Sequence, residues 1–282
     1  MNNRVIKVET DRFSIDCDGQ IVECFARKKV KRASDILVGD IVELETVDGV
    51  TTVKKVQKRK NSLIRPSVAN VDAVIMTLAS VPEPDFYLVD KMIINCARQN
   101  IACIICVNKT DLDAQLYERV KFEFGDDAVV VDCSAKNGDV SRLRDAIDGK
   151  FVCFAGQSAV GKSALINSLC GKKVAVSGDL SAINRGKNTT TRATIFPLGN
   201  NTYIADTPGF GLLEIFDVEY DELDLYYSKY VELSQKCKYH RCTHVNEPMC
   251  EVKKQVELGL ISKQRYERYL QTYIELKSKK KY

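Results

Sequence analysis

The stretch FVCFAGQSAVGKSALINSL, residues 151–169, contains the pattern that decides the fold. It opens with five apolar residues of the kind found in buried strands, and residues 156–163, GQSAVGKS, match the phosphate-loop pattern G-x-x-x-x-G-K-[ST]. The residues that follow read as a helix. In this context the backbone NH groups of the turn and the helix N-terminus face phosphate oxygens. The stretch therefore predicts a nucleotide site in an α/β sheet, rather than a chance glycine turn before a helix.

Each residue of this loop has an expected role. Gly156 and Gly161 allow the tight backbone, Lys162 reaches the β and γ phosphates, and the Ser163 hydroxyl is a ligand for Mg²⁺. We expect nucleotide contacts from Gly156, Gln157, Ser158, Ala159, Val160, Gly161, Lys162, Ser163 and Ala164.

Apolar, β-branched runs alternate with helical segments from about residue 70 onward. The runs are AVIMTLA, IACIICV, AVVVD, FVCFAG and TYIAD, and the helical segments are residues 86–99, 112–124, 140–147 and 162–169. Strands interleaved with helices predict a parallel sheet that is covered on both faces. Ligands of such sheets bind at the carboxyl ends of the strands.

Two motifs at predicted strand ends select the base. In NKTD, the Asp111 carboxylate can accept from both N1 and N2 of guanine, a donor pair that adenine lacks, and the Lys109 stem can lie over the purine. In SAK, the NH of Ala135 can donate to guanine O6. We therefore expect GTP rather than ATP, bound at the base by Asn108, Lys109, Thr110, Asp111, Ser134, Ala135 and Lys136.

The segment after the phosphate loop has the character of nucleotide switches. DTPG, residues 206–209, follows the strand TYIA, so that Asp206 can hold Mg²⁺ through water and the Gly209 NH can approach the γ-phosphate. One of Thr189, Thr190 and Thr191 can coordinate Mg²⁺, and the sequence does not choose among them. We expect the catalytic group to comprise Lys162, Ser163, Thr190, Thr191, Asp206 and Gly209.

The order of the motifs indicates a circular permutation. NKTD and SAK normally follow the phosphate loop and the switches, but here they precede them. The termini of a compact domain often lie close together, which makes such a permutation tolerable. The switch segments therefore end the domain and run into a Cys/His region.

The Cys/His region reads CKYHRCTHVNEPMC, residues 237–250, and we expect a helix from residue 251 onward. It offers Cys237, His240, Cys242, His244 and Cys250 as candidate ligands for a tetrahedral metal that needs four, and zinc suits these residue types. From spacing alone the choice among the five stays open, and free cysteines in a loop are the alternative. Both histidines of the chain lie here, so none is left to act as a base in the nucleotide site.

The two ends of the chain are basic and its middle is acidic. Residues 1–65 have 14 basic and 10 acidic side chains, residues 66–227 have 15 and 22, and residues 228–282 have 13 and 6, within a net charge of +4. This partition predicts a polyanion at the ends, although solvated faces would look the same. Short alternating runs in residues 1–65 predict a small antiparallel barrel of the oligonucleotide-binding (OB) type.

Composition also bears on the compartment. The longest purely apolar run, residues 101–107, is too short to span a membrane, and the N-terminus lacks the apolar region of a secretory signal. We therefore expect a cytoplasmic protein without membrane contact. The eight cysteines outside the Cys/His region are expected to be reduced thiols, and we expect a monomer.

Together these motifs resemble one family, the circularly permuted ribosome small-subunit-dependent GTPase A family of the RsgA or YjeQ type. The likeness covers almost the whole chain, in the order NKTD, SAK, GQSAVGKS, TTT, DTPGF and CKYHRCTHVNEPMC. It implies an OB fold in residues 1–65, a Ras-type GTPase domain in 66–217 and a mostly helical zinc-binding domain in 218–282. It further implies one structural Zn²⁺ on Cys237, Cys242, His244 and Cys250, with His240 not bound to the metal.

The resemblance also implies an activity: GTP hydrolysis with Mg²⁺, stimulated by the small ribosomal subunit and its rRNA during late subunit maturation in the bacterial cytoplasm. Asn188 stands where members commonly have a histidine proposed to assist hydrolysis, and Phe210 stands where Ras-like enzymes have a water-positioning Gln. Ala159 and Ala164 depart from the family at positions of backbone contact, so nucleotide binding should survive. We hypothesise slow intrinsic turnover that the ribosome accelerates. The alternatives are a GTP-dependent regulator of a protein partner without RNA dependence, and a nucleotide binder without catalysis.

Overall fold

Strand β8 (Ala73–Leu78) has the apolar sequence AVIMTL and is buried on both faces. The computed structural model describes residues 3–9, 12–26, 36–63, 68–174, 194–206, 215 and 218–279. Within these residues, six strands form one sheet in the order β10-β9-β8-β11-β13-β12, and all are parallel except β12, which pairs antiparallel with β13. The other five strands are β9 (Ala102–Val107), β10 (Val129–Asp132), β11 (Phe151–Ala155), β12 (Thr194–Gly199) and β13 (Thr202–Asp206).

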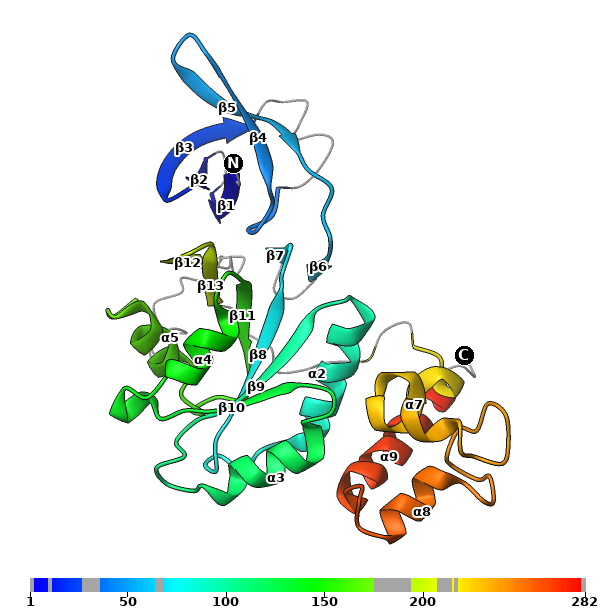
Figure 1. The fold of residues 1–282 in the computed structure, drawn as a ribbon. Helices are drawn as coiled ribbons and strands as arrows, with labels where there is room; N and C mark the ends of the chain where they lie inside the picture. The colour runs from blue at the N-terminus through cyan, green and yellow to red at the C-terminus, as the bar shows by residue number, and fades with distance from the viewer. Residues whose placement is uncertain are drawn as a thin grey trace.

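Helices cover both faces of this sheet (Figure 1). Along β8, Val74 and Met76 pack into the core beneath one pair of helices, whereas Ala73 and Ile75 pack on the opposite side. This alternation confirms the predicted parallel sheet with two covered faces. The first pair comprises α2 (Phe86–Arg98) and α3 (Gln115–Phe124), and the second comprises α4 (Ser141–Ile147) and α5 (Lys162–Cys170).

Two predicted helix boundaries are wrong. Helix α3 begins at Gln115 rather than at residue 112, because the Asp113 carboxylate accepts the NH groups of Gln115 (2.9 Å) and Leu116 (3.3 Å) and so caps the helix there. The single helix expected from residue 251 is divided into α8 (Glu251–Glu257) and α9 (Lys263–Lys279). Gly259, with φ of +73°, ends the first of these.

The N-terminal strands form the predicted barrel. The strand order is β1-β2-β3-β5-β4, in which β3 pairs parallel with β5 and the other pairs are antiparallel. A bridge between Arg4 of β1 and Ile41, just before β4, joins the two ends of this order. This closed order is that of the OB fold. The strands are β1 (Asn3–Val8), β2 (Phe13–Cys17), β3 (Gln20–Ala26), β4 (Val42–Val47) and β5 (Val50–Val56), and a short pair, β6 (Ser62–Leu63) and β7 (Val68–Ala69), leads to the main sheet.

The barrel packs against the amino-terminal ends of β11 and β13. The Tyr203 hydroxyl donates to Asp16 Oδ2 of the barrel at 2.8 Å, and both groups are buried. The Arg4 guanidinium lies 5.0 Å from the centre of the Tyr203 ring and 5.1 Å from that of Phe151. The barrel is therefore fixed to the edge of the sheet opposite the strand ends that carry the motifs.

The C-terminal helices form a separate core beside α2 and α3 (Figure 1). Its centre is a group of tyrosines, with Tyr227 stacked on Tyr230 and both rings edge-to-face with Tyr269. Tyr227 directly follows η2 (Tyr220–Tyr226), Tyr230 belongs to α7 (Ser228–Ser234) and Tyr269 belongs to α9.

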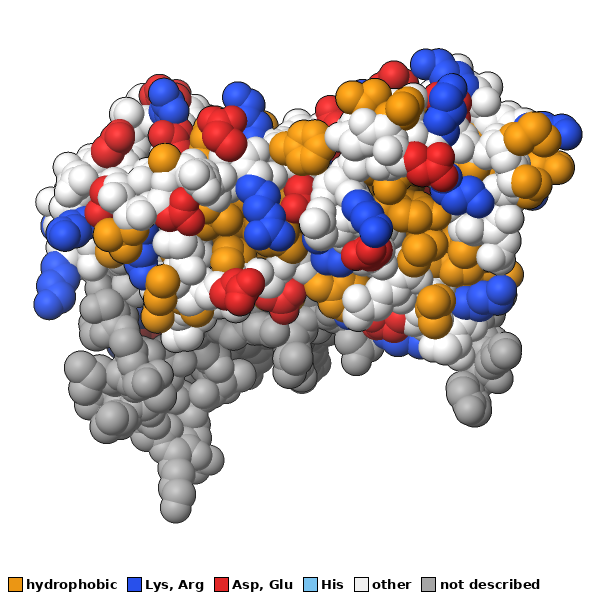
Figure 2. Space-filling model, turned by 90° about the horizontal axis from the view of Figure 1, so that it is seen from below, with side chains coloured by type: hydrophobic (Ala, Val, Ile, Leu, Met, Phe, Trp, Pro, Cys, Tyr) orange, Lys and Arg blue, Asp and Glu red, His pale blue; other side chains and the backbone are white. Residues whose placement is uncertain are grey.

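Surface charge, the thiols and the helices each bear on a further expectation from the sequence. On the face shown in Figure 2, Lys and Arg side chains are interspersed with Asp and Glu among the described residues, so this face has no extended basic area there. All eleven cysteines lie in the described part of the chain and are free thiols there, including the eight outside the Cys/His region. The helices among the described residues are too short or too polar to cross a membrane.

Candidate functional site

The phosphate loop connects β11 to α5, and the surroundings of the two glycines in its sequence pattern leave no room for a side chain. Gly156 has φ of +131°, and a Cβ atom there would lie 2.4 Å from the carbonyl oxygen of Thr77 on β8. At Gly161, with φ of +99°, a Cβ atom would lie 2.3 Å from Nδ2 of Asn108. Only glycine fits either position. The loop is thus packed tightly against β8 and against the base-selecting motif.

The helix that follows presents its N-terminus to the loop. Helix α5 begins at Lys162, and Gly161 before it has no side chain that could cap the helix, so the positive end of the helix dipole faces the loop. Ser163 and Ala164 belong to this turn. The Lys162 ammonium donates to the carbonyl oxygens of Gly156 (2.8 Å) and Gln157 (2.5 Å), which places it over the centre of the loop.

Asn108 brings three motifs together. Its side chain is buried, with 2% exposure, and its Nδ2 donates to the carbonyl oxygen of Val160 in the phosphate loop at 2.9 Å. Its Oδ1 accepts the NH of Ala135 in SAK at 3.1 Å. A single amide therefore holds NKTD, GQSAVGKS and SAK at the carboxyl edge of the sheet.

The remaining residues of NKTD are fixed by separate contacts. Lys109, with φ of +62°, donates from Nζ to the carbonyl oxygens of Val81 and Ala159, each at 2.9 Å. The Thr110 hydroxyl donates to the carbonyl oxygen of Cys133 at 3.0 Å, next to SAK. NKTD is therefore joined to the phosphate loop on one side and to the end of β10 on the other.

Asp111 has the geometry of a base-selecting carboxylate. It is exposed, and its Oδ1 accepts the hydroxyl of buried Ser134 at 2.7 Å. Because one hydroxyl contact fixes the plane of the carboxylate and leaves Oδ2 and a lone pair of Oδ1 unused, both oxygens can accept from a ligand. Lys136 lies exposed in η1 (Ala135–Asn137), beside this group.

The predicted switch residues are described only in part. β13 runs parallel to β11 with Ala205 opposite Cys153, so Asp206 at the end of β13 lies at the same edge of the sheet as the phosphate loop. Thr189, Thr190, Thr191 and Gly209 lie outside the described residues, as do Asn188 and Phe210.

The Cys/His region folds into a cluster of four ligand atoms that lie within 4.8 Å of one another: those of Cys237, Cys242, His244 and Cys250. His244 Nδ1 lies 3.3 Å from the Cys250 sulfur and 3.8 Å from that of Cys237, and these two sulfurs are 4.0 Å apart. Ligands of a tetrahedral zinc ion lie roughly 3.5–3.8 Å from one another, given bonds of about 2.0–2.3 Å. The cluster therefore suits a small tetrahedral cation. His240 is exposed and is not part of the group.

Residues outside the motif hold this cluster in place. His244 is fully buried with Nδ1 facing the thiols, and its Nε2 lies 3.9 Å from Asp224 Oδ2. Burial lowers the pKa of His244 to about 4, which keeps the imidazole neutral, the form that binds metals. The Tyr266 and Tyr269 hydroxyls donate to the carbonyl oxygens of His244 and Thr243 at 2.7 and 2.6 Å.

Sequence reasoning did not find the outer partners of these sites. Ser134, which is expected at the base by its place in SAK, also donates its hydroxyl to the Asp111 carboxylate. Glu247 accepts NH groups from Thr243, Val245 and Asn246 and so braces the loop that carries His244. The position of Glu247, three residues after His244, is only a weak sequence signal for this role. No sequence pattern links Asp224 to His244.

Comparison with known proteins gives a consistent picture. A family model described as RsgA GTPase matches residues 56–216. The Small ribosomal subunit biogenesis GTPase RsgA of Ruminiclostridium cellulolyticum is 37% identical over 91% of this chain and 87% of its own length. The protein of the same name from Caldanaerobacter subterraneus is 35% identical over 100% of this chain and 97% of its own.

Solved structures agree with these sequence matches. YjeQ from Thermotoga maritima superposes with a TM-score of 0.79 at 33% identity, covering 98% of both chains. YloQ, described as a circularly permuted GTPase, superposes with a TM-score of 0.80 at 25% identity, covering 99% of this chain and 95% of its own. With its permuted motif order, its assembled nucleotide motifs and these full-length matches, the chain belongs to the RsgA GTPase family of GTP-hydrolysing enzymes.

Proposed function

We propose that this GTPase acts on the small ribosomal subunit, hydrolysing GTP during late maturation of that particle, and that the subunit accelerates the hydrolysis. The relatives named Small ribosomal subunit biogenesis GTPase RsgA match along nearly the whole chain. We place the protein in the cytoplasm, because small ribosomal subunits mature there. We also propose that the protein acts as a monomer. The alternative of a protein-directed regulator has no comparable support.

The observation that carries the nucleotide part of the proposal is a pair of hydrogen bonds at Asn108, which donates to the Val160 carbonyl oxygen and accepts the NH of Ala135. Because they join base-selecting and phosphate-binding segments, they support one guanine nucleotide spanning both. Asp111 would accept from the guanine N1 and N2 donors. The bound phosphates would be held by the phosphate loop, its helix N-terminus and Lys162, which would exchange two carbonyl contacts for phosphate oxygens.

We propose two metal ions. Mg²⁺, bound with GTP through Ser163 and Asp206, would supply charge neutralisation at the β and γ phosphates. Zn²⁺ on Cys237, Cys242, His244 and Cys250 would have a structural role, since four protein ligands leave no open position for chemistry. The interatomic distances of the cluster and the neutral His244 ring support zinc.

We further propose that residues 1–65 and 218–282 contact rRNA on either side of the GTPase domain, residues 66–217. The positive charge of the C-terminal part is smaller than its composition suggests, because Arg265 and Arg268 are buried in ion pairs with the GTPase domain. Lys238 and Arg241 are exposed and would contact phosphates.

An experiment tests the proposal directly. GTP turnover is measured with and without purified small subunits, and binding to the subunit is measured at two salt concentrations. Strong stimulation together with steep salt dependence supports contacts with rRNA phosphates. Equal turnover rates with and without subunits would overturn the proposal, and stimulation without salt dependence would favour a protein interface.

A further inference from the structure

The side chain of Gln157, the second residue of the phosphate loop, binds a segment that precedes α2. Its Nε2 donates to the carbonyl oxygen of Glu83 at 3.2 Å, and its Oε1 accepts the NH of Asp85 at 3.3 Å. A primary amide can make both contacts at once because it has a donor and an acceptor on one planar group. The general phosphate-loop pattern does not specify a residue type at this position.

The segment that Gln157 holds is the beginning of α2. Asp85 is the N-cap residue of this helix, and its carboxylate accepts the NH of Leu88 at 3.0 Å. Lys109 holds the same segment from the other side through the Val81 carbonyl, while also binding Ala159 of the phosphate loop. The start of α2 and the phosphate loop are therefore bound to each other at three points.

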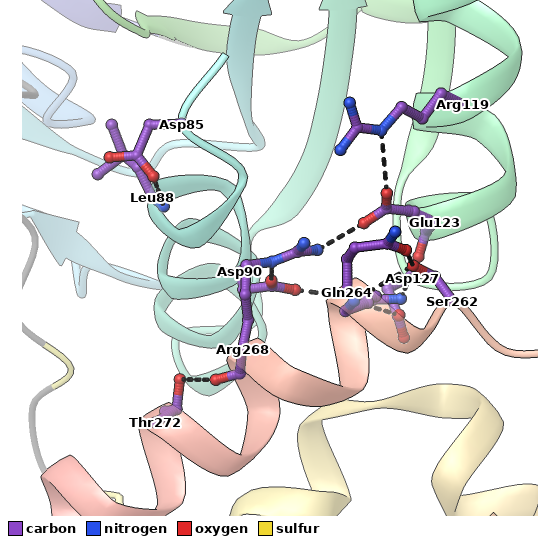
Figure 3. A network of polar contacts seen from close by, with 11 residues as sticks. Asp85, Leu88, Asp90, Arg119, Glu123, Asp127, Ser262, Gln264, Arg268 and Thr272 are labelled. Atoms are coloured by element: carbon purple, nitrogen blue, oxygen red, sulfur yellow. Dashed lines mark hydrogen bonds and ion pairs between the residues drawn. The ribbon is translucent and has the colours of Figure 1, made fainter. Parts of the chain in front are cut away.

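The other side of α2 is held by the C-terminal helix α9. Asp90 of α2 is buried and accepts from Arg265 Nε at 3.1 Å and from Arg268 Nε at 2.6 Å (Figure 3). Arg268 also binds Glu123 of α3 at 2.6 Å, and Arg265 binds Asp127 at 2.7 Å. Buried charges of this kind are stable only while all their partners are in place, so the network holds α9 and α2 in one relative position.

A second contact lies nearer the start of the helix. The Tyr87 hydroxyl donates to Glu275 Oε2 of α9 at 2.6 Å, and the Lys91 ammonium lies 3.0 Å from the same oxygen. Tyr87 follows the N-cap Asp85 by two residues. The first turns of α2 thus lie between the phosphate loop and α9, and each side is joined to them by specific polar contacts.

We propose that Gln157 is a positioning residue that makes nucleotide affinity depend on the docking of the C-terminal domain through α2. The proposal rests on the GTP site proposed above. When α9 is docked on Asp90 and Tyr87, the start of α2 is held, and Gln157 holds the phosphate loop in the conformation that binds phosphates. By thermodynamic linkage, a partner that displaces α9 would change nucleotide affinity, and the nucleotide would change the docking of α9 to the same extent.

A double-mutant cycle in the full-length protein tests the route. Gln157→Met keeps the length of the side chain and removes both hydrogen bonds, and Arg268→Gln removes one charge from the network on α2. The dissociation constant of a fluorescent GDP analogue and the fraction of protein able to bind it are measured for the wild type, both single variants and the double variant. A purely structural defect lowers the active fraction and leaves the dissociation constant of the folded protein unchanged.

We expect each single variant to raise the dissociation constant about threefold to tenfold, and we expect Arg268→Gln to have no further effect in the Gln157→Met background. An unchanged constant in Arg268→Gln would overturn the proposal. Equal factors for Arg268→Gln in both backgrounds would also overturn it, because the effect would then not pass through Gln157.

Two further variants keep the test decisive. Tyr87→Phe removes only the hydroxyl contact with Glu275, so it replaces Arg268→Gln in the cycle if that protein does not fold. Lys263→Gln removes an exposed charge of α9 that pairs with Glu267 of the same helix, and it should bind the analogue as the wild type does. Lys162→Ala separates the two proposals. Normal binding of the GDP analogue by this variant would refute the GTP site. If this variant loses binding while the two substitutions in the cycle act independently of each other, only the route through Gln157 is refuted.

Discussion

The Nδ2 atom of Asn108 donates to the carbonyl oxygen of Val160, 2.9 Å away, and this bond joins the base-selecting motif to the phosphate loop. Asn108 is buried at the end of β9, and Val160 is buried in the loop after β11. β8 lies between these two strands in the sheet, so the hydrogen bond spans the carboxyl end of β8. The site is therefore largely assembled by the protein's own side chains.

Asn108→Ala should raise the dissociation constant for GDP and GTP at least about tenfold. The substitution leaves the Val160 carbonyl and the Ala135 NH without partners, and each buried unpaired group costs about 1–3 kcal/mol. Isothermal titration calorimetry gives the affinity, and thermal unfolding shows whether the protein is intact. Wild-type affinity in a folded variant would show that the bridge does not organise the site.

Asp111→Asn should weaken binding of GTP relative to other purine nucleotides. The amide loses one of the two acceptor oxygens that match guanine N1 and N2, while the Ser134 hydroxyl can still bind the remaining oxygen. Competition between guanine and xanthine nucleotides measures the selectivity. Asp145→Asn, an exposed position on α4, is the matched control. The assignment of Asp111 fails if both variants retain the preference of the wild type.

Lys162→Ala and Ser163→Ala should impair nucleotide-dependent function for different reasons. The first removes the ammonium that lies over the phosphate loop, so affinity for nucleotide should fall. The second removes a Mg²⁺ ligand, so the dependence of turnover on Mg²⁺ concentration should shift to higher values. Titrations of nucleotide and of Mg²⁺ separate these effects, and unchanged affinity and turnover in both variants would contradict the site assignment.

Removing the metal should destabilise the C-terminal helices. Structural zinc contributes folding free energy directly, and the Tyr230 ring packs edge-to-face on His244 at 5.6 Å. The chain has no Trp, so near-ultraviolet circular dichroism reports mainly on its tyrosines, including the buried cluster around Tyr269. Chelation should weaken that signal and release one zinc per chain, and Cys250→Ser should weaken the signal as well. An unchanged signal after complete removal of metal would refute a structural role.

Local patterns predicted the architecture because they lie in single segments. Buried strands, the glycine turn and the helix after it are contiguous in residues 151–169, and the structure has each of them there. Helix ends depended on side-chain contacts that the periodicity does not contain. Asp113 caps α3, which begins three residues after its predicted start, and Gly259 divides the last helical region into two.

Long-range polar contacts were not predictable from sequence. Arg265 and Arg268 contribute to a basic C-terminal composition that suggested a surface for a polyanion, but their charges are buried against Asp90 of α2. Pairing between residues so distant in the chain leaves no local pattern. The same reason explains why spacing alone left five candidate metal ligands, whereas the fold brings four together and leaves His240 exposed.

The rate of GTP hydrolysis with and without purified small ribosomal subunits, measured under multiple turnover at saturating GTP, tests the proposed function most sharply. We expect slow turnover by the protein alone and a rate on the order of tenfold or more higher with subunits, because the partner completes or orders the catalytic site. Lys162→Ala should hydrolyse GTP in neither condition. Equal rates with and without subunits would refute a GTPase that is stimulated by the small subunit.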